Sequence, residues 1–176
     1  MPTLLLLFIN LCRLRAAPQD IPFSRFLMLL CTGCYGLVGF AVSLLDQNPG
    51  LSMVSAIVDV ALIAGLAYLG LWIRDRGRRA VQTISALTGT GTLFNLIGWP
   101  LIAALQQAGD GASGFLYLLL LALIIWNIVV IGHILRHALD IPMWVGTGVA
   151  LMYVYTSIRV MSVLHIVGTT AGTTAS

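Results

Sequence analysis

The chain has 176 residues, of which 59% are hydrophobic and 9% are charged, with a net charge of +3. Soluble domains carry roughly 25% charged residues, so this composition excludes a soluble globular protein. The basic residues lie in short loops beside apolar runs, which indicates membrane topology and argues against nucleic acid as a partner. We therefore expect an all-α polytopic membrane protein whose surroundings are the lipid bilayer.

The first 25 residues contain a short apolar run. Residues 4–12 are apolar but far shorter than the roughly 20 residues that a spanning helix needs. No basic region precedes them and no small-residue cleavage site follows, which argues against a signal peptide. We expect a cytoplasmic segment over 1–25 with a short interfacial helix, or a run that re-enters the membrane. Ser24 is the predicted N-cap of the next helix.

Five apolar stretches after residue 25 are long enough to span a bilayer. They predict a bundle of five transmembrane helices over residues 26–167. Residues 136–140 are predicted to form a short inner loop, and residues 168–176 a disordered outer tail. The predicted spans are 26–45, 51–73, 81–105, 115–135 and 142–167.

The arginines determine the predicted orientation. Residues 74–79 hold four of the nine arginines, between the second and third predicted spans. Such clusters stay on the cytoplasmic side, so the N-terminus is predicted inside and the C-terminus outside. Only Arg159 then falls within a span. Every acidic residue is Asp and every basic residue is Arg, which favours a bacterial source and hence the inner membrane.

Asp59 and Arg159 are the ionisable pair predicted inside the bilayer. Each lies eight residues from the outer end of its helix, roughly 12 Å below the outer surface at about 1.5 Å per residue. Charged groups there are costly and usually face a partner or a cavity. We predict that the two pair near Asn95, either as a structural ion pair or as a proton or ion relay. Otherwise Arg159 extends outward and the pair does not form.

The third predicted span carries a polar stripe on one face. Hydroxyl and amide groups of this kind bridge helices in lipid, or they line a small polar cavity. The stripe consists of Ser85, Thr88, Thr92 and Asn95. The predicted intramembrane polar cluster is therefore Asp59, Asn95, Arg159, Thr88 and Thr92.

His133, His137 and Asp140 share a helical face at i, i+4 and i+7. Two histidines at i, i+4 can chelate a divalent metal, so this trio is a candidate metal site, with polarity at the membrane interface as the alternative. No further ligand lies nearby in the sequence. We therefore expect no metal and no cofactor.

Residues 82–91, with Pro100 beyond them, resemble the core of Yip1-type membrane proteins, which are also five-span and glycine-rich. Residues 14–22 resemble a run in small bacterial inner-membrane proteins of this size. The Yip1 resemblance implies a helical membrane factor without catalytic residues. No site residue is therefore carried over from it.

The chain shows no Ser/His/Asp arrangement, paired carboxylates or H-E-x-x-H motif, and we expect a protein that is not an enzyme. A small-residue stripe in the first span lets helix backbones approach closely in lipid. It favours a protein that binds or organises other membrane proteins, or copies of itself. The stripe consists of Thr32, Gly36, Gly39 and Ser43.

The alternative is a small transporter or channel subunit, with a polar path near Asp59, Asn95 and Arg159.

Overall fold

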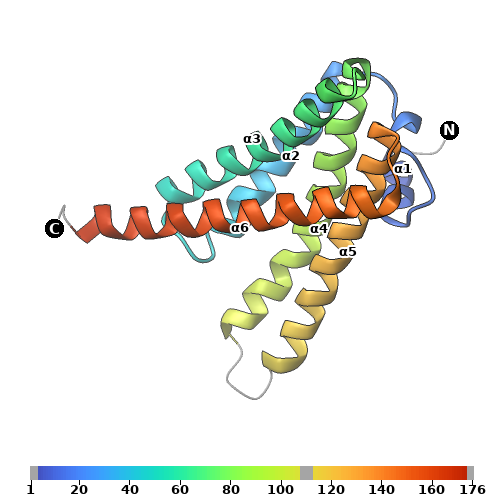
Figure 1. Cartoon of the computed structure of the whole chain (residues 1–176). Helices are drawn as coiled ribbons and strands as arrows, with labels where there is room; N and C mark the ends of the chain where they lie inside the picture. The colour runs from blue at the N-terminus through green and yellow to red at the C-terminus, as the bar shows by residue number, and fades with distance from the viewer. Residues whose placement is uncertain (1–3, 108–112, 174–176) are drawn as a thin grey trace.

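The structure is a computed structural model that describes residues 4–107 and 113–173. Across this part of the chain it is all-α, with six α-helices and two short 3-10 helices (Figure 1). Four of these helices are long and apolar enough to cross a membrane, namely α2, α3, α5 and Met143–Leu164 of α6. Its helix composition makes the chain a multi-pass membrane protein. The bounds are α1 Leu4–Cys12, η1 Pro18–Asp20, α2 Arg25–Ser43, α3 Pro49–Ile73, η2 Gly77–Arg79, α4 Ala80–Gln107, α5 Ser113–Leu139 and α6 Met143–Thr173.

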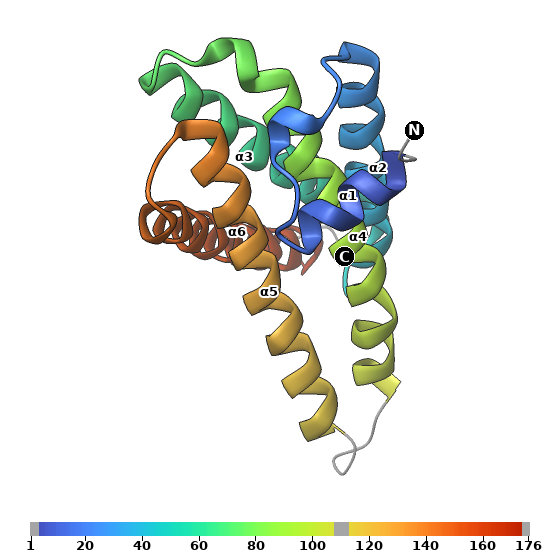
Figure 2. The ribbon, with the colours of Figure 1, turned by 90° about the vertical axis from the view of Figure 1, so that its right-hand side faces the viewer.

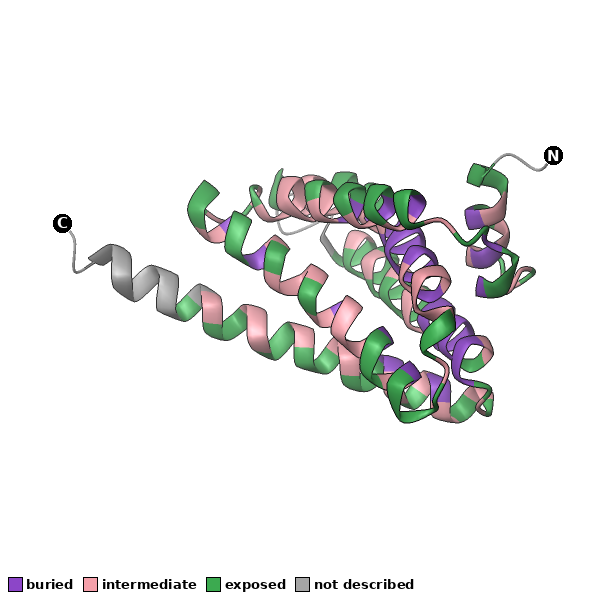
Figure 3. Ribbon diagram, turned by 90° about the horizontal axis from the view of Figure 1, so that it is seen from above, coloured by how far each residue is buried: buried purple, intermediate pink, exposed green. Residues whose placement is uncertain are grey.

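Helices α2 to α6 alternate in direction and converge at one end. This arginine end carries residues 74–79, the arginine loop, and the helix ends that lie away from it are together called the far end. The α2–α3 pair and α6 run one way from the arginine end, whereas α4 and α5 run another (Figure 1, Figure 2). Buried residues gather where the helices converge, and the diverging lengths are more exposed (Figure 3).

Helix α4 is the central helix near the arginine end. Residues 85–91 are all buried, because α1, α2, α3 and α5 pack around α4. A helix enclosed by protein need not be strongly apolar, and this one carries serine, threonine, glycine and asparagine. That composition explains why the predicted span 81–105 is not among the four helices long and apolar enough to cross a membrane, although α4 is 28 residues long.

The hydroxyl groups of α4 bond within their own helix. Those of Thr88, Thr90 and Thr92 each donate to the carbonyl of residue i−4, at 2.7, 2.7 and 2.8 Å. Thr83 and Ser85 do the same, at 2.9 and 2.7 Å. The bridges predicted from this stripe to other helices are therefore replaced by bonds inside α4. The physical reason is that the i−4 carbonyl is always within reach and needs no neighbouring helix.

The glycines of the Thr-Gly-Thr-Gly-Thr run receive aromatic rings from two other helices. A Cβ atom on Gly89 would overlap the ring of Phe8 from α1. A Cβ atom on Gly91 would lie 2.6 Å from Cε2 of Tyr35, which comes from α2. Small residues of this kind let neighbouring groups approach a helix backbone in lipid. The alternation of glycine and threonine thus gives α4 two positions where an aromatic ring packs on its backbone. The threonines between them form hydrogen bonds within α4.

The N-terminal segment packs against α4 and α5. Figure 2 shows α1 lying over α4. Leu11 of α1 and Ile21 beyond η1 are both buried. Trp126 Nε1 of α5 donates to the Cys12 carbonyl at 3.0 Å, and the Gln82 amide of α4 donates to the Ile21 carbonyl at 2.6 Å. The helix predicted over 4–12 is therefore present with those bounds, and it is anchored to the bundle.

The starts of α2 and α3 follow local capping signals. Ser24 Oγ accepts a hydrogen bond from the Leu27 amide at 3.2 Å, which confirms the predicted N-cap of α2. Asn48 Oδ1 accepts from the Leu51 amide at 2.9 Å, and Pro49 follows it at the first helical position. The tight turn between these helices therefore ends in the N-cap and the first residue of α3.

Two helices extend further than predicted. Helix α5 reaches Leu139, so most of the predicted loop 136–140 is its last turn. Helix α6 reaches Thr173, where an irregular tail over 168–176 is predicted. Extending an existing helix needs no new nucleus, so α6 continues through glycine and threonine where no proline interrupts it. Residues 174–176 lie outside the described part of the chain.

Candidate functional site

Asp59 of α3 is the centre of a polar cluster inside the bundle. Its carboxylate accepts hydrogen bonds from Tyr35 Oη at 2.5 Å, Tyr153 Oη at 3.2 Å and Ser157 Oγ at 3.1 Å. Tyr35 belongs to α2, and the other two donors belong to α6. Three hydroxyl groups thus satisfy the carboxylate oxygens without supplying a positive charge.

Arg159 does not pair with Asp59, which corrects the predicted ion pair. In the part of the chain that the structure describes, the one salt bridge joins Arg76 and Asp140 at 3.0 Å. Ser157 points toward Asp59, and a residue two positions later is turned by about 200° around the helix axis. Arg159 accordingly lies on the exposed side of α6. This arrangement agrees with the alternative in which Arg159 extends away.

Tyr35 is positioned by α4. Its side chain is 7% exposed, and its ring lies over the backbone of Gly91. Any larger residue at that position would push the ring away. Gly91 therefore determines where the Tyr35 hydroxyl lies, and hence where it meets Asp59.

A cavity of about 400 Å³ lies beside Asp59, between the two diverging groups of helices. Residues from α2, α3, α4, α5 and α6 line it. Most of its lining is aliphatic or aromatic. Such a cavity suits a small ligand with an apolar body and one polar group. Its polar side chains are Tyr35, Asp59, Asn95, Asn127, Tyr153 and Ser157.

A second cavity, of about 180 Å³, lies nearer the far end. Asp59, Asn95 and Ser157 line both cavities, so the carboxylate stands where the two meet. The other walls come from the last turns of α2, the second turn of α3 and the middle of α6. They consist of Gly39, Val42, Ser43, Ser55, Ala56 and Met161.

Two residues of the predicted polar cluster meet at this site. They are Asp59 and Asn95, which line both cavities. Thr88 and Thr92 bond within α4 and line neither cavity. Arg159 faces outward. Of the predicted cluster, Asp59 and Asn95 therefore lie together at the site. Thr88, Thr92 and Arg159 do not line it.

The three donors to Asp59 were not predicted from the sequence. A signal was present for two of them, because tyrosine in membrane proteins concentrates at the two interfaces. Tyr35 and Tyr153 instead lie near the middle of the predicted spans 26–45 and 142–167. A tyrosine at that depth needs a partner for its hydroxyl.

The candidate metal trio does not converge. The rings of His133 and His137 make an edge-to-face contact with centroids 4.6 Å apart. Asp140 lies beyond the end of α5 with a φ of 57°, so it leaves the shared face, and it pairs with Arg76. His133 Nε2 lies 3.0 Å from the Ala16 carbonyl. Among the described residues, no group of three or more His, Cys, Asp or Glu side chains is placed to hold a metal ion.

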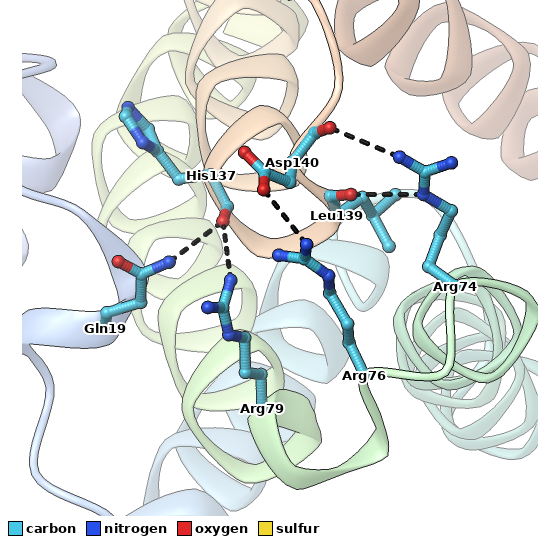
Figure 4. A network of polar contacts seen from close by, with 7 residues as sticks. All are labelled: Gln19, Arg74, Arg76, Arg79, His137, Leu139 and Asp140. Carbon is cyan, nitrogen blue, oxygen red and sulfur yellow. Dashed lines mark hydrogen bonds and ion pairs between the residues drawn. The ribbon is translucent and has the colours of Figure 1, made fainter.

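The arginine loop caps the end of α5 (Figure 4). Arg74 Nε donates to the Leu139 carbonyl at 3.2 Å, and Arg79 Nη1 donates to the His137 carbonyl at 3.4 Å. The last carbonyls of a helix have no partner within it, and cations suit the negative end of its dipole. The arginines therefore hold the α3–α4 connection against α5.

No family model, no curated protein and no solved structure matches the chain. The resemblance of residues 82–91 to Yip1-type proteins therefore stays a prediction.

Proposed function

We propose that the protein is a small membrane transporter that binds a lipophilic cation beside Asp59. One observation carries the proposal: Asp59 has three hydroxyl donors and, within the described residues, no ion-pair partner. An ionisable side chain inside a bilayer is costly and marks a substrate or ion site by default. A bound cation supplies the missing positive charge.

The larger cavity supports a ligand that is apolar apart from its cationic group. Most of the lining is aliphatic or aromatic, and Asp59 is its one charged side chain. Tyr35 and Tyr153 bring phenol rings close to the carboxylate. Aromatic faces attract organic cations. The proposed substrate class is therefore amines in their protonated form, or quaternary cations, with a hydrocarbon body that fits about 400 Å³.

The proposed topology includes α4 as the fifth span. This helix has 28 residues and no charged side chain, and its neighbours enclose it near the arginine end. We propose that α1 re-enters the membrane from the arginine end, because Phe8 packs on Gly89 and the Cys12 carbonyl bonds Trp126, both far inside α4 and α5. Positively charged loops stay in the cytoplasm, so the arginine end is proposed to face the cytoplasm of a bacterial cell. The far end and the C-terminus then lie outside.

Organisation of other membrane proteins has weaker support. It depended on the small-residue stripe of the first span, and two glycines of that stripe face this chain's own helices. A Cβ atom on Gly36 would lie 3.4 Å from Val60 of α3, and one on Gly39 would lie 4.0 Å from Asn95 of α4. These two glycines therefore face the interior of the bundle. The proposed role remains non-enzymatic, since it needs binding and release alone.

Equilibrium binding of tetraphenylphosphonium to the full chain in nanodiscs tests the proposal. We expect saturable binding to the wild type. Asp59→Asn should weaken it by roughly thirtyfold or more, because losing one partner of a buried charge pair costs about 2–5 kcal/mol. Asp46→Asn makes the same change in the α2–α3 turn, away from both cavities, and should leave binding unchanged.

Tetraphenylborate is the matched control ligand, since it has nearly the same size and shape but carries a negative charge. We expect no saturable binding of this anion. Equal binding of the two ions would show that the cavity takes apolar molecules regardless of charge. Unchanged cation binding by Asp59→Asn would remove Asp59 from the site.

A further inference from the structure

The smaller cavity extends from Asp59 toward the ends of α2 and α3 nearest the α2–α3 turn, and about half of its lining residues are polar. Ser157 Oγ donates to the carboxylate at 3.1 Å and also lines this cavity. Ser43, at the end of α2, and Ser55, in the second turn of α3, line it nearer the far end. Asn95 is a further polar lining residue. Hydroxyl and amide groups therefore recur along this cavity.

The α2–α3 turn is bonded to one wall of this cavity, at Ser55. Ser55 Oγ donates to Gln47 Oε1 at 3.1 Å, and Ser52 Oγ donates to the Gln47 carbonyl at 3.5 Å. A water molecule takes roughly 30 Å³ in the liquid and needs two to four polar partners. A cavity of about 180 Å³ with this lining has both the room and the partners for several waters.

We infer that Asp59 exchanges its proton with the aqueous phase at the far end through the smaller cavity. The two cavities approach the same carboxylate with different chemistry. The smaller one offers serine hydroxyls and an amide, along which a proton can move between waters. The larger one offers mainly aliphatic and aromatic walls, which suit the body of a ligand.

The groups around Asp59 assign the exchanging proton to this residue. Tyr35 from α2 and Tyr153 from α6 are the titratable side chains that face it. Tyrosine ordinarily loses its proton near pH 10. Helix α4 presents Asn95 and α5 presents Asn127, and neither amide titrates. Among the described residues that line the two cavities, Asp59 is the one charged side chain.

Proton access from the far end also makes the proton and the cation compete for Asp59, a consequence that rests on the proposed function. A single carboxylate cannot hold a proton and a cationic ligand together. A cation that arrives through the larger cavity therefore displaces the proton of Asp59, which leaves through the smaller cavity to the far side. Rebinding of a proton from the far side releases the cation. The proton and the cation therefore compete for Asp59.

Labelling with dicyclohexylcarbodiimide tests the access route, because this reagent modifies protonated carboxyl groups inside membranes. The full chain is reconstituted in liposomes with the far end outward, an orientation checked by protection of the arginine loop from trypsin. Peptide mass spectrometry then measures the rate at Asp59 while the pH of one side is changed. We expect the rate to fall as the outside pH is raised. Dependence on inside pH alone, or on neither, would overturn the inference.

Variants that fill the smaller cavity provide a second test, in which the response of Asp59 labelling to outside pH is measured again. A Cβ atom on Gly39 meets only Asn95 Nδ2, at 4.0 Å, so the side chain of Gly39→Val fits within the cavity. We expect this variant, and Ser43→Leu, to lose the response to outside pH. Gly33→Val is the matched control on α2, since a Cβ atom there has no neighbour within 4 Å. Wild-type responses in both cavity variants would exclude the smaller cavity as the route.

Protection by tetraphenylphosphonium separates the two proposals. Slower labelling of Asp59 in its presence supports the cation site, whichever side supplies the proton. A response to far-side pH without protection supports the proton route and counts against the cation site. Protection combined with a response to arginine-side pH alone keeps the cation site and overturns the proton route.

Discussion

The phenol ring of Tyr35 packs on the backbone of Gly91, and its hydroxyl donates to Asp59 at 2.5 Å. The position of the hydrogen bond from Tyr35 of α2 to Asp59 of α3 therefore depends on a glycine of α4. The Tyr35 ring packs directly on the backbone of α4. The position of its hydroxyl group therefore depends on the absence of a side chain at residue 91. This dependence makes the carboxylate site sensitive to a residue that lines its larger cavity but makes no polar contact with Asp59.

Gly91→Ala should displace the Tyr35 ring. The new Cβ atom would lie 2.6 Å from Cε2, and overpacking of this kind costs about 1–3 kcal/mol. We expect the free energy of unfolding, measured by denaturant titration in detergent, to fall by that amount, and tetraphenylphosphonium binding to weaken. Gly33→Ala should keep the stability or raise it by up to about 1 kcal/mol, because alanine is the better helix former. Equal stabilities of the two variants would mean that the ring moves freely.

Tyr35→Phe removes one donor to Asp59 and keeps the ring in place. Hydrogen bonds between membrane helices contribute about 0.6 kcal/mol on average and about 1.7 at most. We therefore expect unfolding free energy to drop by about 0.6–1.7 kcal/mol in the same titration. Tyr155→Phe, at a side chain that is 65% exposed on α6, should have no effect. A loss in the control as large as in Tyr35→Phe would contradict a specific role for the bond to Asp59.

Most of the helices could be predicted because their signals are local. Apolar runs of spanning length and the Asn48-Pro49-Gly50 turn mark α2 and α3, and Ser24 marks a helix start. The central position of α4 was harder to predict from the sequence. Its threonines suggest contacts with other helices, yet their hydroxyls bond to their own backbone. Sequence alone does not show which partner a hydroxyl chooses.

The site was predicted in part, because depth in the bilayer can be estimated from sequence but rotation cannot. Asp59 and Asn95 stand out as polar groups within apolar runs, and they do line the same cavities. Arg159 was placed at the depth of Asp59 from its distance along α6. Two residues earlier on the same helix, Ser157 points at the carboxylate, which turns Arg159 to the outside. The position of a side chain around the axis depends on how each helix packs.

Gly146→Ala should be more damaging than Gly91→Ala. A Cβ atom on Gly146 would lie 2.6 Å from the carbonyl oxygen of Gly132 on α5, so the two helix backbones touch. A backbone cannot turn away as a ring can, and we expect a loss of about 3 kcal/mol or more in unfolding free energy. Gly148→Ala, two residues later, meets nothing within 4 Å and serves as the control. Comparable stabilities for this pair would show that α5 and α6 separate readily at this crossing.

The thiol of Cys12 reports how firmly the N-terminal segment is anchored. Burial raises the pKa of Cys12 from its ordinary value near 9 to about 11. The folded protein therefore holds this proton more tightly than the unfolded chain does. The resulting stabilisation is fully present below about pH 9 and is lost as the pH rises through about 11. Relative to Cys12→Ser, the wild type should lose free energy of unfolding across that window.

Alkylation kinetics check the same pKa directly. In a chain with Cys31→Ala and Cys34→Ala, the folded protein should react slowly with iodoacetamide at pH 8, because the thiolate is the reactive form. The rate should rise about tenfold per pH unit and level off near pH 11, as followed by mass spectrometry. Truncation before residue 13 is no substitute, since it removes Leu11 and Phe8 from the core as well. A plateau near pH 9 would instead mean that α1 leaves α4 and α5 and exposes Cys12 to water.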